Sequence, residues 1–319
     1  MSGLGMMGSV GIALQTSYQA SNVASLRSFP VISETLEHTI ESMVEGGMYQ
    51  RFAEGPRHKG AMQVAGGLEF EPQPHLLGLA AYLVCGSSQT SFTGSIATHK
   101  FRPRLTSDWD EAISLPAATI LVDRDVGSSM AYFGCCADQL KLDLAQGALL
   151  KGSLAFVGGF FGQLADVAPV YPVERPFVFN VASVSWGGVA AQFVRSLSLT
   201  VRNQLKPEWT LNGSATPALI KRSGPVQVSG RLVLLFQSNS LMPDFTTPTQ
   251  RQLLVTLTSD VASPARLVID VPKARPTTYA PQLGGPGLIE LPMDFVGEID
   301  TTSNYVAEFT VVNSVVGYP

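Results

Sequence analysis

The feature that most constrains the fold of this chain is an internal repeat. Residues 60–68 and 224–232 are identical at five of nine positions, beginning with Gly60 and Gly224. Each copy precedes a stretch suited to a short helix, residues 74–85 in the first and 238–245 in the second. A later pair, residues 147–158 and 286–297, ends in the same Phe-Val-Gly. Features that recur in the same order predict two copies of one structural unit.

The spacing between the copies changes along the chain. The offset falls from 164 residues at the first pair of segments to 139 at the second, so the first copy holds about 25 extra residues, which we place in 86–111. Three prolines between Pro169 and Pro176 are typical of a linker. We therefore expect an N-terminal arm over residues 1–28, a first copy over 29–168, a linker over 169–180 and a second copy over 181–319.

Apolar and polar residues alternate with a period of two in many segments. Met62, Val64, Leu68 and Phe70 lie on one face of a strand, and the same pattern recurs at residues 140–144, 197–201 and 267–271. Residues 74–85 instead carry leucines at helical spacing, with Gly86 as a stop. The predicted fold is mainly β, with two related β-sandwich or barrel-like domains, each with a short flanking helix.

Composition excludes several classes of protein. A 45% apolar chain with 14% charged residues is not disordered, and a net charge of −4 excludes a strongly basic nucleic-acid binder. The longest apolar stretches are shorter than the roughly 20 residues needed to span a bilayer. The N-terminus lacks the pattern of a secretory signal, so synthesis in a cytoplasm is expected. Three cysteines, with Cys135 and Cys136 adjacent, favour buried thiols over disulfides.

Patterns that would indicate catalysis are weak. Gly3–Gly8 has the letters of a dinucleotide fingerprint but no preceding strand. The four histidines have no zinc-binding spacing. The strongest metal or acid–base candidate is His38 with Glu34, Glu37, Glu41 and Glu45, because a helix would place several of these side chains on adjacent faces. A solvated acidic face is the favoured interpretation of this cluster, so we predict no enzyme, cofactor or metal.

Two charged segments allow other interpretations. A strand with cations around Phe101 could contact phosphates; these are Lys100, Arg102 and Arg104. A carbohydrate-active enzyme would need two carboxylates in one cleft, for which the acidic run offers Asp108, Asp110 and Glu111. In both segments, solvated side chains are the favoured interpretation.

Several segments together resemble the tail tube proteins of long-tailed bacteriophages of the siphophage type, in the duplicated form with two related halves. The similarity covers most of the chain and rests on the order and spacing of residues 8–18, 33–36, 60–83, 146–158, 197–207, 230–236 and 288–297. None of these segments is diagnostic alone, because each describes a strand with its turn.

The resemblance implies a structural virion protein that assembles into stacked rings. The rings form the tube through which double-stranded DNA passes into the host. It implies a trimeric ring with pseudo-six-fold symmetry, with a hexamer as the alternative, because single-domain relatives form hexamers. It also implies tape-measure, tail terminator and distal tail proteins as partners, a location in the virion after synthesis in the host cytoplasm, and no membrane span.

A mildly acidic conduit would let DNA slide without being held by cations. The charge of −4 lies entirely in residues 1–165, which carry 14 acidic and 10 basic side chains. We therefore expect acidic lumen-lining residues from the first half, with Glu37, Glu41, Glu69 and Glu71 as candidates. Residues 1–28 and 86–111 are candidates for contacts between successive rings.

The main alternative is a phage surface adhesin, or receptor-binding β-sandwich, which would share the alternating strands. It would carry exposed aromatic residues at loop tips and would not polymerise.

Overall fold

The computed structural model describes residues 3–16, 18, 25–47, 53–105, 115–172, 174–247, 249–259, 265–283 and 287–318. The fold is mainly β, as predicted, and its strand pairing is antiparallel. Two α-helices lie within the described residues, α1 (Pro74–Cys85) and α2 (Met242–Thr246). Both coincide with the stretches that follow the internal repeat. Short 3-10 turns occur at η1 (Gly5–Met7), η3 (Phe179–Val181) and η4 (Asn239–Leu241).

One antiparallel sheet, which we call the spanning sheet, runs through both halves of the chain. Its strands in spatial order are β3 (Val31–Glu34) with β4 (Glu37–Val44), β5 (Arg57–Phe70), β10 (Lys151–Gly158), β9 (Ser129–Ala145), β14 (Val194–Arg202), β17 (Gln227–Leu235) and β20 (Glu290–Gly297). Beyond β20, the amides of Thr277 and Gln282 donate to the β20 backbone. Residues 277–283 thus take the last position, and each half contributes four.

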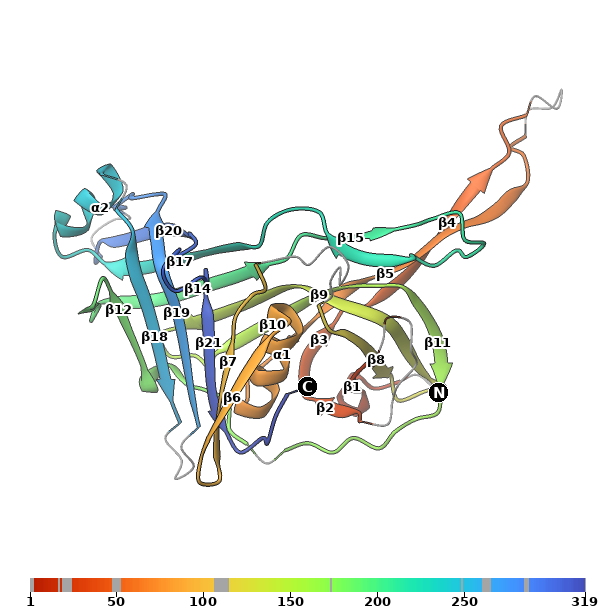
Figure 1. The fold of residues 1–319 in the computed structure, drawn as a ribbon, viewed down its shortest axis with the longest axis horizontal. Helices are drawn as coiled ribbons and strands as arrows, with labels where there is room; N and C mark the ends of the chain where they lie inside the picture. Colours follow the sequence, from red (N-terminus) through yellow and green to blue (C-terminus); the bar gives the residue numbers. More distant parts are fainter. Residues whose placement is uncertain are drawn as a thin grey trace.

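A second layer of strands backs the spanning sheet in each half. The first back layer comprises β2 (Arg27–Phe29), β1 (Ser9–Leu14), β8 (Ala117–Asp123), the first part of β9 and β11 (Phe160–Leu164). The second comprises β13 (Val189–Ala190), β12 (Ala182–Trp186), β18 (Arg251–Thr258), β19 (Arg266–Pro276) and β21 (Glu308–Asn313), extended by β7 (Ile96–Phe101) and β6 (Ser88–Thr93). In Figure 1, β18, β19 and β21 run nearly vertical, across the strands of the spanning sheet.

The long strand β9 belongs to both layers because it contains a bulge. The register with β10 shifts between Phe156, which lies opposite Ala137, and Ala155, which lies opposite Gln139, so Asp138 has no partner of its own. A bulge bends a strand and increases its twist. The residues before the bulge pair with β8 and β11, and the residues after it pair with β14.

Helix α1 lies between the layers and contacts β9, β7 and β21. Pro74 begins the helix, and Gly86 ends it in the left-handed conformation at φ +73, donating its amide to the Tyr82 carbonyl. Ten of its twelve residues are buried. Such a helix has no polar face, which is why it occupies the interior rather than the surface.

One large hydrophobic core runs through both halves. The same cluster includes Leu77 of α1, Phe156 of β10, Leu199 of β14 and Phe295 of β20. Each such side chain, fully buried, contributes about 1.5–3 kcal/mol relative to exposure. The two halves therefore share a sheet and a core.

Two segments differ from the sequence-based expectation. Residues 1–28 were expected to form an arm, but Ser9–Leu14 is strand β1, which pairs with β2 and β8 and buries Val10 and Ile12. Residues 88–101 belong to the weakly patterned segment predicted to contact successive rings; they form the ordered hairpin β6–β7, which pairs with β21, and the predicted contact between rings stays a prediction. Parts of these two segments lie outside the described residues, namely 1–2, 17, 19–24 and 106–111.

The repeated glycine at Gly66 in β5 and Gly230 in β17 has a steric explanation. A Cβ on Gly66 would lie 2.2 Å from the carbonyl oxygen of Thr35, and a Cβ on Gly230 would lie 2.4 Å from that of Ser198. Gly66 also has φ +134, which other residues rarely adopt. Glycine at this place lets the neighbouring strand approach in both halves.

Gly66→Ala and Gly230→Ala should each destabilise the fold by about 1–3 kcal/mol, because the adjacent strand must shift. Gly46→Ala is the matched control, since no atom lies within 4 Å of the position its Cβ would take. That change should stay within about 0.5 kcal/mol. Denaturant unfolding followed by tryptophan fluorescence measures all three, and equal stability of the Gly66 and Gly46 variants would contradict the steric explanation.

Candidate assembly surfaces

One side of the spanning sheet is buried and the other is polar. Along β10, Leu154 and Phe156 are buried, whereas Lys151 is exposed and Ser153 is partly exposed. Their cross-strand neighbours in β5, β9, β14, β17 and β20 follow the same alternation. The outward side chains form a continuous surface that we call the polar face. Its charged members include Glu37, Glu69, Lys141, Asp143, Lys151, Arg202, Arg231, Glu290 and Asp294.

Opposite charges are interleaved on the polar face. One cross-strand row runs through Lys151, Asp143, Ser198, Arg231 and Asp294. The Arg231 guanidinium lies 3.8 Å from the Asp294 carboxylate, and the ammonium of Lys141 lies 2.7 Å from the Asp143 carboxylate. Exposed pairs of this kind contribute only about 0–1 kcal/mol each to stability. Their main effect is to leave the face close to neutral.

The four glutamates predicted to line a lumen occupy different places. Glu69 lies on the polar face, where its carboxylate accepts a hydrogen bond from the Ser33 hydroxyl at 3.0 Å. Glu37 lies on the same face at the start of β4. Glu41 lies farther along β4, where the register with β5 breaks, and Glu71 follows the end of β5. The structure therefore brings two of the four to one surface.

The two halves are joined by the ladder between β9 and β14. Seven residue pairs make this ladder, from Gln139–Arg202 to Ala145–Ser196. It is as regular as the ladders within each half, because neither strand is interrupted along this stretch. The junction thus demonstrates how one half binds another through its sheet edge.

A hairpin from the second half reinforces this junction. The hairpin consists of β15 (Leu205–Glu208) and β16 (Leu219–Arg222) and continues directly from β14. Its Leu205 and Ile220 pack with Ala117 and Cys136 of the first half. Side chains of this hairpin therefore add apolar contacts between the halves to those made by the paired strands.

The corresponding hairpin of the first half projects from the body (Figure 1). This hairpin arm consists of β4 and the adjoining part of β5 and spans residues 37–63, of which 48–52 lie outside the described residues. Every residue of β4 is exposed, including Ile40, Met43 and Val44, whose exposed fractions are 44–53%. Grouped exposed apolar residues indicate a binding surface.

The acidic cluster around His38 does not form a metal or acid–base site. These residues do not lie on a helix: Glu34 lies in β3, and Glu37, His38 and Glu41 lie in β4, where successive side chains point to opposite faces. The His38 ring stacks on Phe161, with 3.6 Å between ring centroids. Glu45 instead contacts the His58 ring at 2.8 Å.

Two cations at the end of strand β7 are paired with a carboxylate of the neighbouring strand. Lys100 and Arg102 both lie beside Glu308 of β21, at 3.4 and 2.6 Å, and Phe101 between them is buried. The carbonyl of Arg104 accepts a hydrogen bond from Arg222. This pairing agrees with a structural role for the strand instead of phosphate contact. The acidic run Asp108, Asp110 and Glu111 lies outside the described residues.

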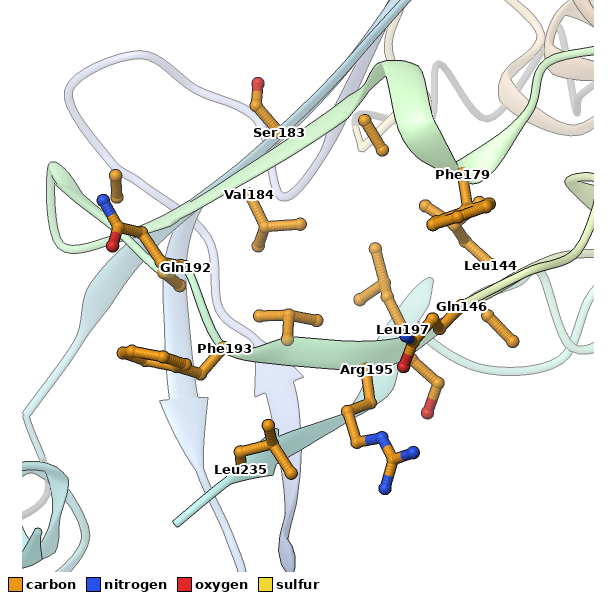
Figure 2. Close-up of a pocket in the computed structure, with 16 residues that line it drawn as sticks. Leu144, Gln146, Phe179, Ser183, Val184, Gln192, Phe193, Arg195, Leu197 and Leu235 are labelled. Carbon is orange, nitrogen blue, oxygen red and sulfur yellow. The ribbon is translucent and has the colours of Figure 1, made fainter. Parts of the chain in front are cut away.

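A groove of about 530 Å³ lies where the second half begins (Figure 2). Leu144 and Gln146 from the end of β9 form one side, and β12 with the start of β14 forms the other. None of its lining residues is a carboxylate, and the Arg195 side chain is paired with Glu290 at 2.6 Å. The groove has no acid–base pair and is a gap between the packed halves.

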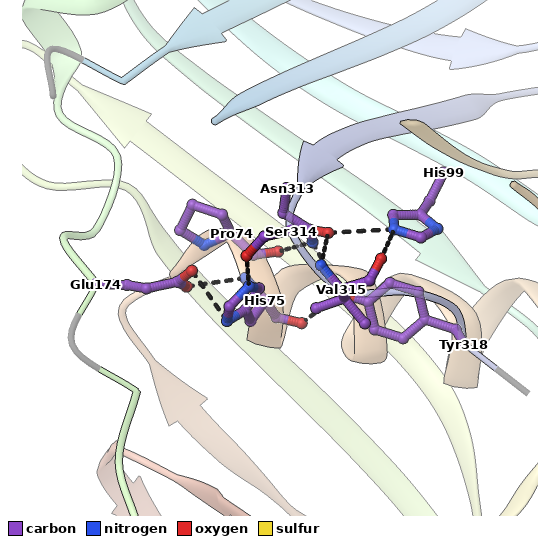
Figure 3. Close-up of polar contacts among 8 residues, drawn as sticks. All are labelled: Pro74, His75, His99, Glu174, Asn313, Ser314, Val315 and Tyr318. Carbon is purple, nitrogen blue, oxygen red and sulfur yellow. Dashed lines mark hydrogen bonds and ion pairs between the residues drawn. The ribbon is translucent and has the colours of Figure 1, made fainter. Parts of the chain in front are cut away.

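A polar network holds the C-terminal segment to the start of α1 (Figure 3). The Tyr318 hydroxyl donates to the His75 carbonyl at 2.7 Å, and the His75 ring lies 3.0 Å from the Glu174 carboxylate of the linker. Buried His99 contacts the side-chain oxygen of Asn313 at 3.1 Å. These contacts connect four separate segments of the chain, which is a structural role.

The three cysteines, Cys85, Cys135 and Cys136, are free and buried, as predicted. Burial raises the pKa of Cys136 to about 12, so its thiol stays protonated and unreactive. Across the described ranges, no group of three or more His, Cys, Asp or Glu residues converges as a metal site would require. None of the described helices is long and apolar enough to cross a membrane.

A family model described as phage tail tube protein matches residues 7–297, from the residues just before β1 to the end of β20. The chain belongs to the phage tail tube protein family. A search of curated proteins finds no match. The family agrees with the resemblance noted in the sequence, and it makes this tail tube chain a structural component of the phage tail.

Family membership decides between the interpretations left open above. It favours the tail tube over an adhesin and over a carbohydrate-active enzyme. The tail tube match ends at Gly297, so β21 and the C-terminal network lie beyond the matched residues.

Sequence patterns alone missed the hairpin arm of this tail tube protein. Both faces of β4 are exposed, so residues 37–44 show no apolar alternation. The signal that could have identified the arm is the internal repeat, because β4 and the start of β5 lead into the first repeated segment as β15 and β16 lead into the second.

Protonation of His99 should destabilise the tail tube protein. Burial lowers the pKa of His99 below its ordinary value of 6.5. Its ring nitrogens already contact the Thr90 hydroxyl and the Asn313 and Val315 oxygens. Because the unfolded chain binds the proton more readily, this stability is present above pH 6.5 and is lost as the pH falls through the folded-state pKa.

Melting temperatures of the wild type should therefore fall between pH 7.5 and pH 5, and His99→Gln should show a weaker pH dependence. His58→Gln is the control, because the His58 side chain is 57% exposed. Parallel profiles for the wild type and His99→Gln would argue against this role.

Proposed function

We propose that copies of this chain close into rings that stack as the tail tube of a siphophage-type virion and conduct double-stranded DNA into the host. The observation that carries the proposal is the spanning sheet, which has one polar face and two edges without a strand partner among the described residues. A sheet with two open edges can close into a ring only by pairing with further copies.

We propose further that the two halves are copies of one unit. Each half supplies four positions to the spanning sheet and five strands to its back layer, in the same order. The spatial order β5–β10–β9 corresponds to the order β17–β20–β19. Three chains would then supply six copies, which favours a trimer with pseudo-six-fold symmetry over a hexamer.

The dimensions of such a ring fit its proposed cargo. Six copies of four strand positions give a barrel of about 24 strands. At roughly 4.8 Å between strands and a tilt near 40°, its backbone diameter is about 45–50 Å. Inward side chains then leave room for a DNA duplex.

We propose that the polar face lines the lumen, with Glu37 and Glu69 among its acidic residues. Three of its cations are held by carboxylates: Lys141 by Asp143, Arg231 by Asp294, and Arg202 by Asp138 at 3.5 Å. Paired cations gain little from displacing the counterions of DNA, so the duplex is not retained. This lumen is close to neutral and less acidic than the sequence suggested.

The remaining parts of the proposal rest on the family. Tape-measure, tail terminator and distal tail proteins are the expected partners, and the protein is expected to be made in the host cytoplasm before incorporation into the virion. The hairpin arm, with its exposed apolar residues, is a candidate for contacts between copies, and residues 1–28 and 86–111 stay the predicted contacts between successive rings.

Negative-stain electron microscopy of the purified protein over a range of concentrations tests self-assembly. We expect rings or hollow tubes whose end-on views have three-fold or pseudo-six-fold symmetry. Six complete chains in each ring would support the hexamer instead. Absence of rings and tubes at all concentrations would contradict self-assembly of this chain alone.

Reversing charge on the polar face should make the tubes retain DNA. The triple variant Glu69→Lys, Asp143→Lys and Asp294→Lys adds free cations where the duplex would pass, so DNA binding should appear at low salt and weaken as salt rises. The matched control replaces the same residues with Gln, Asn and Asn; it frees Lys141 and Arg231 but adds no cation, so its DNA binding should be weaker than that of the lysine variant. Filter binding measures the difference, and equal DNA binding by both variants would argue against a lumen at this face.

A further inference from the structure

We infer that the two open edges of the spanning sheet pair with each other between copies of this chain. Residues 34–39 of one copy lie antiparallel to residues 278–283 of a second copy, in the register that β14 and β9 use within the chain. This inference rests on the proposed self-assembly and specifies the residues that make the contact.

The β9–β14 ladder supplies the geometry. The Asn203 amide donates to the Asp138 carbonyl at one end, and the Gln146 amide donates to the Arg195 carbonyl at the other. Between these two ends, hydrogen-bonded pairs therefore alternate with non-hydrogen-bonded pairs, and the hydrogen-bonded ones can be assigned. They are Val201–Leu140, Leu199–Leu142 and Leu197–Leu144.

The open edge of the first half corresponds to β14. Glu34 lies opposite Leu68, as Leu197 lies opposite Leu232, and the two leucines opposite are equivalent in the internal repeat. The pair His38–Val64 likewise matches the pair Val201–Val228, so the difference in residue number between this edge and β14 is the same in both comparisons. Residues 34–39 therefore correspond to 197–202.

The open edge of the second half corresponds to the end of β9. Pro276 lies opposite Phe295, as Ala137 lies opposite Phe156, and both phenylalanines belong to the repeated Phe-Val-Gly. The pair Gln282–Glu290 likewise matches the pair Asp143–Lys151, so the difference in residue number between this edge and β9 is the same in both comparisons. Residues 278–283 therefore correspond to 139–144.

Transferring the internal register gives a definite set of partners between copies. The non-hydrogen-bonded pairs are Thr39–Thr278, Glu37–Ala280 and Thr35–Gln282. The hydrogen-bonded pairs are His38–Tyr279, Leu36–Pro281 and Glu34–Leu283. Residues 278–283 contain no charged side chain, so Glu34 and Glu37 meet no like charge in this register.

The proline in this edge has a specific counterpart. Pro281 has no N–H, so it cannot donate to the Leu36 carbonyl opposite it. In the chain itself, that carbonyl already accepts a hydrogen bond from the Tyr132 hydroxyl at 3.0 Å. At the internal junction, Leu142 takes the place of Pro281 and has an N–H. Val271 takes the place of Tyr132 and has no hydroxyl. The carbonyl on this edge therefore accepts from the Tyr132 hydroxyl at the junction between copies and from a backbone N–H at the internal junction.

The edge at Leu36 is capped in a single chain. The Leu36 amide donates to one oxygen of Glu34 at 3.0 Å, and Arg124 binds the other oxygen at 2.6 Å. On pairing, the Pro281 carbonyl of the second copy replaces this carboxylate as the acceptor. A side-chain cap of this kind limits unspecific pairing of an open edge.

The hairpin arm extends the same contact. β4 continues from the first open edge as β15 continues from β14, and the hairpin of β15 and β16 packs on the neighbouring half. In the inferred register, the exposed Met43 and Val44 lie over the second half of the adjoining copy.

A cysteine pair at a non-hydrogen-bonded position tests the register. Glu37→Cys with Ala280→Cys places the two thiols at opposite edges of one chain, so a disulfide between them requires two copies. The Cα atoms of such a pair are about 4.5 Å apart, within the range that a disulfide spans. Oxidation of assembled rings with diamide, which accepts the two thiol hydrogens, should yield covalent dimers and trimers on non-reducing gels. Thr35→Cys with Gln282→Cys is the second in-register pair, should the first fold poorly.

Two matched controls define the result. Thr200→Cys with Lys141→Cys is the equivalent pair at the internal junction and should form a disulfide within one chain. Glu37→Cys with Pro281→Cys shifts the register by one residue and turns the thiols to opposite faces, so it should not cross-link.

Cross-linking of both in-register pairs, without the shifted pair, would support the inference. Rings or tubes that form while only the internal control oxidises would overturn the register and leave self-assembly intact. Cross-linking of the shifted pair as readily as the in-register pair would also overturn it. A chain that forms neither rings nor cross-links would overturn both the pairing and the self-assembly on which it rests.

Discussion

The backbone ladder between β9 and β14 is the interaction on which the rest of the structure depends. It joins two halves that would otherwise each present an unsatisfied sheet edge, and it aligns their polar side chains on one continuous face. An unpaired backbone group has a large cost when it is buried, so a buried edge must find a partner. The ladder satisfies one edge from each half and leaves the other two available.

Much of the fold could be predicted because its cause is local. The alternation of Leu197, Leu199 and Val201 defines a half-buried strand, and Pro74 with Gly86 defines α1. The repeated glycine also carried information, because Gly66 and Gly230 are the places where a neighbouring carbonyl leaves no space for a Cβ. These residues record constraints that act within a few ångströms of themselves.

Other features depend on contacts between distant residues, which no local pattern encodes. β1 pairs with β8, more than 100 residues later, so its place in the back layer could not be read from residues 9–14 alone. β4 is exposed on both faces, so it lacks the apolar period that reveals a strand, and its glutamates suggested a helix. The polar face was only partly predicted, since assigning Glu69 and not Glu41 to it requires the register between strands.

The internal and open junctions differ in ways that suit their different roles. The internal junction is held twice, by β9 with β14 and by β7 with β21, and the C-terminal network adds to it. The strand β7 lies between α1 and β8 in the first half, whereas in the second half the described residues pass from α2 to β18 without such a hairpin. The open edges thus lack this reinforcement and carry a capped amide and a proline instead. In the inferred pairing, the capped amide and the proline would make the open edges selective for a partner in one register.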